Sequence, residues 1–341
     1  MNERYLYTSV TRISDLGQGN FELGRLRREE WDDADYIAGR VMSTPSDLYQ
    51  LELANGRLMD VMEGARVIGA FGRRTATLEA VGDWRQIGED GLMHALTGAG
   101  LFGRATSVAP WLGPLISLSY EGHVLRGGRK LGMGDFVRPI AQAEFHVPVI
   151  LLIGTSMSAG KTTTGRVIIH ELKRADLKVA GAKFTGAGRY RDILSFQDAG
   201  ADVIVDFVDA GLPSTAVPEA RFGPAMEHML ARIAESRPDV VIAEAGASPL
   251  EPYNGEAAVA ALGDNVCCTV LCASDPYAVL GVQTAFGVRP DLVTGPTANT
   301  EAGIALVSRL TGLESLNLSK AASLPRLLQI LKERLPAGLL G

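Results

Sequence analysis

A glycine-bounded loop that ends in a lysine and a threonine is the clearest sign of chemistry in this chain. Residues 147–167 read VPVILLIGTSMSAGKTTTGRV: an apolar run, a loop from Gly154 to Gly160, and then Lys161 and Thr162 at the start of a helical pattern. Backbone N–H groups of such a loop converge at a helix N-terminus, where they bind phosphate oxygens. The order strand, loop and helix therefore predicts a P-loop, with Lys161 on the β- and γ-phosphates of a nucleotide and Thr162 on Mg²⁺.

The loop is a longer variant of the common pattern. A strict match has Gly or Ala five residues before Gly160, where this chain has Thr155, and its glycine stands one place earlier. A helix cap followed by a surface lysine is the alternative interpretation of a GKT triplet, but the strand before it and the helix after it favour a phosphate loop. The residues expected to bind nucleotide here are Gly154, Ser156, Met157, Ser158, Ala159, Gly160, Lys161, Thr162 and Thr163.

Charged residues also stand at the ends of two other expected strands. Lys183 lies in GAKFTG at the end of one apolar run, Asp192 opens the next helical pattern, and Glu244 ends the apolar run DVVIAEAG. An acid in the position of Glu244 is typical of a Walker B-type carboxylate near Mg²⁺. Each residue has a structural alternative: an exposed strand-end lysine, a helix N-cap, and a buried acid bonded to neighbouring N–H groups, respectively.

Taken together, these motifs resemble dethiobiotin synthetase and its relatives, in the P-loop class that also holds the cobyrinic-acid amidating enzymes and the cell-division ATPase MinD. The loop 154–162 is similar to the long loop of that family. The other similar segments, in the family's order, are the lysine segment 181–186, the metal-binding helix start 192–197, the EGAGG strand end 244–247 and the adenine-reading segment 295–299.

The resemblance implies ATP and Mg²⁺ as cofactors. It implies a metal site at Thr162, Asp192 and Glu244. It also implies that Lys161 and Lys183 are the catalytic residues, which would contact phosphate or an activated carboxyl intermediate.

The resemblance further implies that Asn299 contacts adenine. Two departures from the family pattern are visible. Thr155 and Ser156 stand where the family has a loop aspartate beside the substrate amines, and Phe184 stands where it has a proline. The missing aspartate argues against the dethiobiotin reaction itself, and the missing signature lysine at the same place argues against MinD-like switches.

The composition is that of an ordinary soluble protein with room for two domains. The chain has 341 residues, 46% hydrophobic and 21% charged, with a formal charge of −6 and no basic block, so nucleic acid is not an expected partner. No segment approaches the ~20 apolar residues that cross a bilayer, and we expect a cytoplasmic protein without a membrane partner. The cysteines, Cys267, Cys268 and Cys272, share one apolar run and are expected to be buried, reduced thiols.

Residues 1–140 are expected to form a β-rich, barrel-like domain. Residues 1–30 look like an irregular surface lead-in. Alternating pieces then predict antiparallel strands, with a hairpin turn at Asn55-Gly56. The predicted strands are 35–42, 48–61, 65–72 and 76–82, and a strand pair at 115–132 with turns at Glu121-Gly122 and Gly127-Gly128, while 91–110 is expected to be helical or looping.

Residues 147–341 are expected to form the P-loop NTPase domain. Strands and helices alternate along it, which is typical of a mostly parallel, doubly wound α/β sheet with ligands at the carboxyl ends of its strands. The further strands are expected at 177–184, 202–209, 239–246, 266–273, 291–295 and 313–318. The helices are expected from 161, near 192–199, at 220–236, near 256, after 276, at 300–311 and at 320–334.

The function predicted from these features is an ATP- and Mg²⁺-dependent enzyme that activates a carboxyl or carbamate group of a small metabolite by phosphoryl transfer. A regulatory ATPase is the alternative, with the loop 186–188 as its switch. An acyltransferase is a third possibility, because the layout of a β domain before the P-loop resembles a little-characterised bacterial family that includes D-glutamate N-acyltransferases. A homodimer is the family-level expectation.

Overall fold

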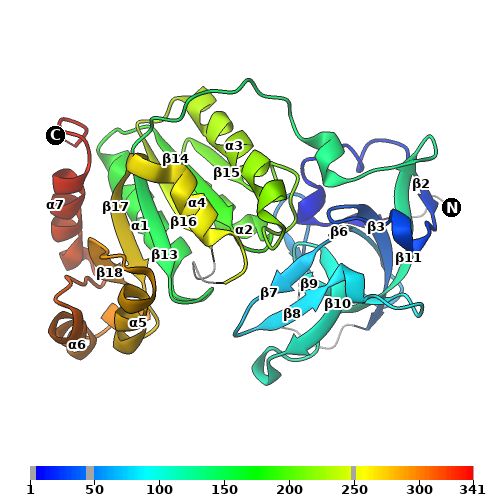
Figure 1. Ribbon diagram of the computed structural model, residues 1–341, viewed down its shortest axis with the longest axis horizontal. Coiled ribbons are helices and arrows are strands. Elements are labelled where there is room, and N and C mark those ends of the chain that lie inside the picture. Colours follow the sequence, from blue (N-terminus) through cyan, green and yellow to red (C-terminus); the bar gives the residue numbers. More distant parts are fainter. Residues whose placement is uncertain (1–4, 44–49, 247–250, 341) are drawn as a thin grey trace. The chain divides into compact units, whose positions relative to one another are not determined.

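The computed structural model describes residues 5–43, 50–246 and 251–340, and its elements are labelled in Figure 1. The chain divides into two compact units. The first unit contains Met1–Pro139, Gly186–Arg191 and Phe207–Ala225, and the second contains Ile140–Thr185, Asp192–Asp206 and Met226–Gly341. Two segments from within the P-loop half of the sequence therefore pack with the N-terminal β region.

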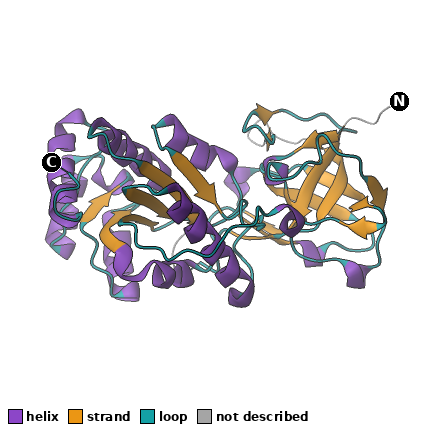
Figure 2. Ribbon diagram, turned by 90° about the horizontal axis from the view of Figure 1, so that it is seen from above, coloured by secondary structure: helices purple, strands orange, loops and turns teal. Residues whose placement is uncertain are grey.

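A closed barrel forms the centre of the first unit (Figure 2). Its strands are β3 (Tyr36–Ser43), β6 (Arg66–Phe71), β9 (Leu92–Thr97), β10 (Leu101–Val108) and β11 (Ser117–Arg126). The order β6-β3-β11-β9-β10 is antiparallel throughout, and β10 then pairs with β6 in parallel, which closes the ring. Closure leaves these strands without a free edge and confirms the expected barrel-like domain.

The barrel interior is apolar and aromatic. Phe71 stacks on Trp31 and Trp84 at centroid distances of 4.9 and 5.7 Å. Shorter elements surround the barrel: β1 (Tyr5–Tyr7), β2 (Glu22–Gly24), β4 (Leu51–Glu52), β5 (Leu58–Met59), β7 (Arg73–Thr75), β8 (Ala80–Asp83), β12 (Arg129–Lys130) and the short 3-10 turns η1 (Ser9–Thr11), η2 (Arg28–Glu30), η3 (Trp84–Gln86), η4 (Pro110–Leu112) and η5 (Met133–Phe136). The predicted Asn55-Gly56 turn joins β4 and β5.

Three expectations for the first unit were wrong. Residues 91–110 form the hairpin of β9 and β10, because Gly98 and Gly100 supply a tight turn between two strands rather than a flexible stretch. Glu121-Gly122 is no turn but a bulge within β11, where the register to β3 shifts. Residues 1–30 are not a plain surface lead-in, since β1 pairs with β6 and Val10 and Leu16 are fully buried.

A six-stranded parallel sheet forms the centre of the second unit. The order is β15-β14-β16-β13-β17-β18, and every pairing is parallel. The strands are β13 (Val149–Gly154), β14 (Val179–Thr185), β15 (Val203–Asp206), β16 (Val240–Ala245), β17 (Val266–Cys272) and β18 (Leu292–Thr294). Nearly all of their residues are buried, which explains the continuous apolar runs in the sequence.

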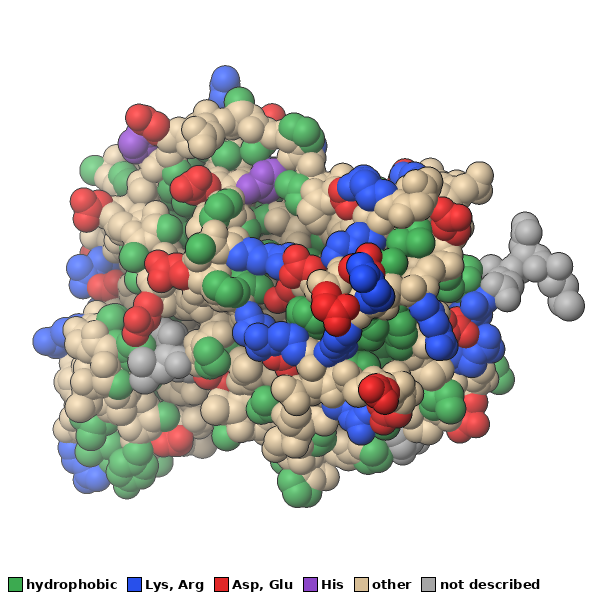
Figure 3. All heavy atoms as spheres, turned by 45° about the vertical axis from the view of Figure 1, so that its right-hand side comes forward, with side chains coloured by type: hydrophobic (Ala, Val, Ile, Leu, Met, Phe, Trp, Pro, Cys, Tyr) green, Lys and Arg blue, Asp and Glu red, His purple; other side chains and the backbone are tan. Residues whose placement is uncertain are grey.

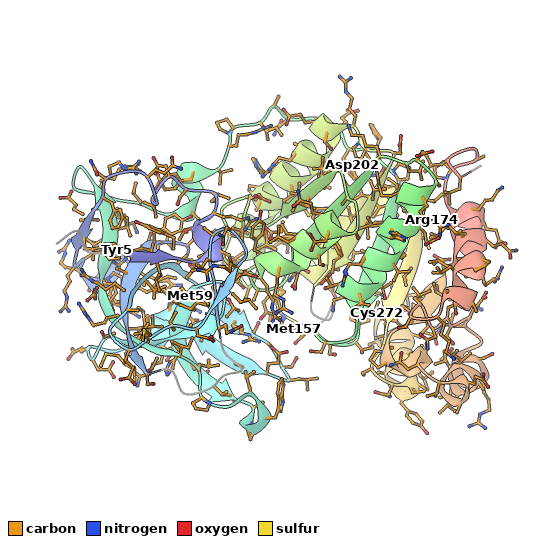
Figure 4. All side chains as sticks on the ribbon, turned by 180° about the vertical axis from the view of Figure 1, so that it is seen from behind. Tyr5, Met59, Met157, Arg174, Asp202 and Cys272 are labelled. Atoms are coloured by element: carbon orange, nitrogen blue, oxygen red, sulfur yellow. The ribbon has the colours of Figure 1, made fainter. Side chains whose placement is uncertain are left out.

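Helices cover both faces of this sheet. Helices α1, α2 and α7 share an apolar cluster with one face, while α4 contacts β14 and β16 and is drawn in front of them in Figure 1. Figure 4 shows α1 from behind, with Arg174 at its end. The helices are α1 (Lys161–Arg174), α2 (Tyr190–Asp198), α3 (Glu219–Ser236), α4 (Gly255–Leu262), α5 (Pro276–Phe286), α6 (Glu301–Thr311) and α7 (Leu324–Arg334). The chain thus has a doubly wound P-loop NTPase fold with an N-terminal β domain.

One predicted strand of the second unit is absent. Residues 313–318 make a single bridge, from Ser315 to Val293, instead of a ladder. Their leucines bury apolar surface at the sheet edge without extending it: Leu313 is 5% exposed and Leu318 is 8% exposed. The short turns η6 (Gly263–Asn265), η7 (Pro296–Ala298) and η8 (Ala321–Ser323) complete the unit.

The cysteines are free thiols in β17. Cys268 and Cys272 are buried, and burial raises the pKa of the Cys272 thiol to about 11. Cys267 is half-buried. Within residues 5–43, 50–246 and 251–340, no helix combines the length and apolarity that spanning a membrane requires.

Candidate functional site

The phosphate loop leaves the buried strand β13 and turns into α1 at Gly160. Gly160 has φ +94°, a left-handed conformation that glycine adopts without strain, and the helix begins at the next residue. The Lys161 side chain folds back over the loop, where its Nζ donates to the Ser156 carbonyl oxygen at 2.8 Å. Gly154 leaves room for this lysine, because a Cβ there would lie 2.7 Å from Nζ. The loop therefore accommodates the Lys161 side chain against its own backbone.

Two neighbouring strand ends support the loop. The Thr155 N–H donates to the Cys272 carbonyl at 3.1 Å, and the Thr155 hydroxyl also accepts from the Ser274 N–H at 3.1 Å. Gly295, which follows β18, packs so closely that a Cβ would lie 2.5 Å from the Ala159 carbonyl oxygen. Figure 4 labels Met157 in the loop and Cys272 at the end of β17.

The loop residues predicted to bind nucleotide differ in exposure. Gly154 and Ala159 are buried, whereas Ser158 and Thr163 are exposed. Those of intermediate exposure are Ser156, Met157, Gly160 and Thr162. A loop with both exposed and buried residues is compatible with a ligand on its outer side and packing on its inner side.

Glu244 lies beside the first turn of α1. Strand β16 is the direct neighbour of β13, and this places the Glu244 carboxylate where the Thr162 hydroxyl donates to it at 3.0 Å. Glu244 is 3% exposed. The two residues predicted to hold Mg²⁺ here are therefore hydrogen-bonded neighbours, and their contact with a metal stays a prediction.

Lys183 and Asp192 form the second part of the site. The Lys183 Nζ donates to the Asp192 carboxylate at 2.6 Å, and both side chains are largely buried, at 8% and 20% exposure. Lys183 stands directly opposite Glu244 in the pairing of β14 with β16. The lysine is thus not the exposed strand-end residue of the structural alternative. Asp192 lies beside Lys183, and its contact with a metal stays a prediction.

Asp206 is a further acid of this cluster that our sequence reasoning missed. It ends β15 directly opposite Lys183 and is 1% exposed. The signal was present, because Asp206 terminates an apolar run in the same way as Glu244. Apolar residues follow Asp206 in the run DVIVDFVD, so the sequence predicts a strand that continues beyond it.

Burial and neighbouring charges act in opposite directions on the ionisable groups. Burial lowers the pKa of Lys161, although Glu244 favours its charged form. Burial also disfavours charged Lys183, but Asp192, Glu244 and Asp206 outweigh it and raise its pKa. Burial raises the pKa of the Glu244 carboxyl, against the attraction of both lysines. Ionisable groups whose pKa values are shifted by burial and by neighbouring charges are typical of ligand sites.

Asn299 follows η7, next to the loop-packing Gly295. Asn299 is exposed, and its backbone carbonyl oxygen accepts from the Asn317 side-chain amide at 3.1 Å. The 295–299 segment therefore flanks the phosphate loop, as a base-binding segment should. Contact of the Asn299 amide with a base stays a prediction.

The donor set fits Mg²⁺. Thr162, Glu244 and Asp192 offer oxygen ligands, which this hard cation prefers, and Mg²⁺ usually takes one or two protein carboxylates together with phosphate oxygens. The Thr162 hydroxyl and the Glu244 carboxylate already point at one another. Asp192 is paired with Lys183 instead, so a metal held by all three would draw Asp192 away from its lysine.

Comparison with known proteins finds neither a matching family model nor a matching curated protein. Similar solved structures include chloroplast FtsY from Physcomitrella patens (13% identity, TM-score 0.36, covering 52% of this chain and 59% of that one). A DUF1611 family protein from Anabaena variabilis has 17% identity and a TM-score of 0.39, covering 61% and 66%. The signal recognition particle 54 kDa protein from Aeropyrum pernix, in complex with GDP, has 18% identity and a TM-score of 0.33, covering 58% and 50%.

The matches span less than two thirds of each of these chains. At such identities and TM-scores the likeness carries no argument about activity. The P-loop NTPase fold of this chain follows from its own strand order, loop and helix.

Proposed function

We propose that this protein binds ATP with Mg²⁺ at the carboxyl ends of β13, β14 and β16 and transfers the γ-phosphoryl group to a carboxyl or carbamate group of a small metabolite. The observation that carries the proposal is the convergence of the P-loop lysine with a second buried lysine, Lys183, and two acids at one edge of the sheet. Phosphoryl transfer depends mainly on positioning and charge neutralisation, and these groups supply both.

Each residue has a role that its position supports. The loop N–H groups and Lys161 would hold the phosphates, with Lys161 exchanging the Ser156 carbonyl for a phosphate oxygen. Thr162, Glu244 and Asp192 would hold Mg²⁺, which when bound neutralises phosphate charge. Lys183, released by Asp192, would stabilise the acyl phosphate oxygens formed on the acceptor carboxylate.

A regulatory ATPase is the second candidate, and one observation favours it. The segment Gly186–Arg191 follows β14 and precedes Asp192, yet it belongs to the first compact unit. A loop with this placement could transmit a change at Asp192 to the β domain. The acyltransferase alternative rests on layout only.

Nucleotide turnover with candidate acceptors distinguishes these functions. Purified protein would be incubated with ATP and Mg²⁺, and ADP release would be measured with and without panels of small carboxylic acids and amines. The proposal expects a large increase in ADP release with one acceptor class. A slow rate that no acceptor changes would support the regulatory ATPase, and failure to bind any nucleotide would reject both.

A further inference from the structure

A buried carboxylate of the β region caps the start of helix α2. Glu52, at the end of β4, is 1% exposed. Its Oε2 accepts from the Tyr190 N–H at 2.7 Å and its Oε1 accepts from the Arg191 N–H at 2.8 Å. These are the first two N–H groups of α2, which have no partner within the helix. Negative charge at this helix end is also favoured by the helix dipole.

The cap is held from its other side by side chains of the same compact unit. The Ser9 hydroxyl donates to Glu52 Oε2 at 2.5 Å. The Arg12 guanidinium lies over the Tyr190 ring, 4.5 Å from its centroid, and pairs with Asp209 at 3.2 Å. The segment 186–191 is bonded in turn to residues 213–215, where the Gly188 N–H donates to the Pro213 carbonyl at 2.9 Å. Glu52 therefore accepts three hydrogen bonds in all, one from a hydroxyl and two from backbone N–H groups.

The residues capped by Glu52 directly precede Asp192 of the candidate metal site. Arg191, bonded to Glu52, is followed directly by Asp192, which accepts from Lys183 at 2.6 Å. In an α-helix that starts at Tyr190, the position of the third residue follows from the position of the first two. The Glu52 contacts and Asp192 therefore share the first turn of one helix.

We propose that Glu52 is a positioning residue of the nucleotide site: it fixes the first turn of α2 and thereby holds Asp192 against Lys183. Its effect on metal binding rests on the proposed function, whereas its effect on α2 and on Lys183 does not. Glu52 touches neither nucleotide nor metal and acts only through Asp192.

The test compares Glu52→Gln with Glu121→Gln in the full chain. Glu121 is the matched control, because it is a largely buried glutamate of the same compact unit whose ion pairs are with Arg40 and Arg66, on the barrel strands β3 and β6. Glutamine keeps the volume of glutamate but cannot accept both N–H groups as a charged carboxylate does. Hydrogen bonds to a charged group are worth about a factor of ten or more, so amide exchange across 190–192 should rise about tenfold in Glu52→Gln alone.

A second readout follows Lys183 without any nucleotide. The Lys183 amine is 8% exposed, so its acylation by a water-soluble reagent, quantified by mass spectrometry, should be slow in the parent protein and in Glu121→Gln. It should be several-fold faster in Glu52→Gln. Unchanged exchange at 190–192, or faster exchange with unchanged Lys183 acylation, would overturn the proposal even if the protein binds nucleotide well.

The third readout is the Mg²⁺ dependence of ATP binding in a double-mutant cycle with Asp192→Asn. If Glu52 acts through Asp192, the single variant Glu52→Gln should need about tenfold more Mg²⁺ for half-saturation than the parent protein. The double variant should need the same Mg²⁺ concentration as Asp192→Asn alone. Additive effects would overturn the positioning role. A parent protein that binds no nucleotide would reject the proposed function, and the exchange and acylation results would then decide the positioning role alone.

Discussion

The two compact units treat buried charge in different ways. In the β unit, two buried acids have fixed protein partners: Glu52 accepts from two backbone N–H groups and a hydroxyl, and Asp35 pairs with Lys130 at 2.9 Å. In the P-loop unit, Lys161, Lys183 and Glu244 are buried at one edge of the sheet, where their hydrogen-bond partners are the Ser156 carbonyl, the Asp192 carboxylate and the Thr162 hydroxyl, respectively.

The difference indicates which charges a ligand could engage. A buried carboxylate bonded to backbone N–H groups cannot change partner without local unfolding, whereas a lysine bonded to a loop carbonyl or to an acid can exchange that partner for a phosphate oxygen or a metal. On the face drawn in Figure 3, basic and acidic side chains lie side by side rather than in a patch of one sign.

The largest effect is expected from Lys161→Ala. This change should weaken ATP binding by about a hundredfold or more, because each hydrogen bond to a charged group is worth about 1.5–3 kcal/mol and the lysine would reach two phosphates. Isothermal titration with ATP and Mg²⁺ would measure it, and circular dichroism would show that the variant is folded. Lys173→Ala, on the same helix and paired with Asp202, is the control. Equal affinity of both variants and the parent would refute the P-loop assignment.

A smaller, metal-specific effect is expected from Glu244→Gln and Asp192→Asn. Each should raise the Mg²⁺ concentration for half-maximal turnover by tens of fold, because each removes a charged oxygen ligand, while nucleotide binding without metal changes little. Thermal melts in parallel separate a metal role from a structural one. If Glu244 is merely structural, Glu244→Gln will melt at a different temperature with an unchanged Mg²⁺ response. That result in both variants would leave the acids in the same class as those of the β unit.

A still smaller effect is expected for base preference. Asn299 offers one amide donor and one acceptor to a base edge, and no aspartate follows it in ANTEAG to select guanine. Asn299→Ala should lower the preference for ATP over GTP by about tenfold, the loss expected for one or two neutral hydrogen bonds. Competition binding with both nucleotides would measure it. Preference for GTP in the parent protein would contradict the adenine assignment.

The smallest effect concerns Asp33 in the β unit. The neighbouring arginines do not fully offset the cost of burying its charged carboxylate. Its side chain is 10% exposed, and burial raises its pKa from 3.8 to about 6 although Arg221 and Arg73 oppose the rise. Because the folded state holds this proton more tightly, the stabilisation is complete below pH ~4 and is lost as pH rises through about 6. A pKa shift of this size corresponds to about 3 kcal/mol in the free energy of unfolding. We expect a change of about 1 kcal/mol, because the surroundings of the carboxylate relax.

Asp33→Asn should therefore be more stable than the parent at pH 8 and should lose that advantage near pH 4. Urea unfolding at both pH values would measure the change, with the exposed neighbour variant Asp32→Asn as control. If Asp33→Asn and the parent show the same pH dependence, the carboxyl is compensated like the other acids of its unit.

Short-range patterns in the chain predict its local structures. The apolar run before Gly154, the glycine at 160 and the Lys161-Thr162 pair specify strand, loop and helix start through short-range geometry, and the alternation beyond them specifies a parallel sheet. Period-two patterns likewise indicated the β domain, although two glycines in the 91–110 region concealed a hairpin whose strands are recognisable only once they pair with the barrel.

The contacts between charged residues depend instead on the order of the strands and on long-range packing. Strand order cannot be read from periodicity, and it is the placement of β16 beside β13 and of β15 beside β14 that brings Glu244 to Thr162 and Asp206 to Lys183. The cap of α2 by Glu52 joins residues 138 positions apart. Contacts of that range depend on how the whole chain folds, because no local pattern around Glu52 distinguishes it from a surface glutamate of a short hairpin.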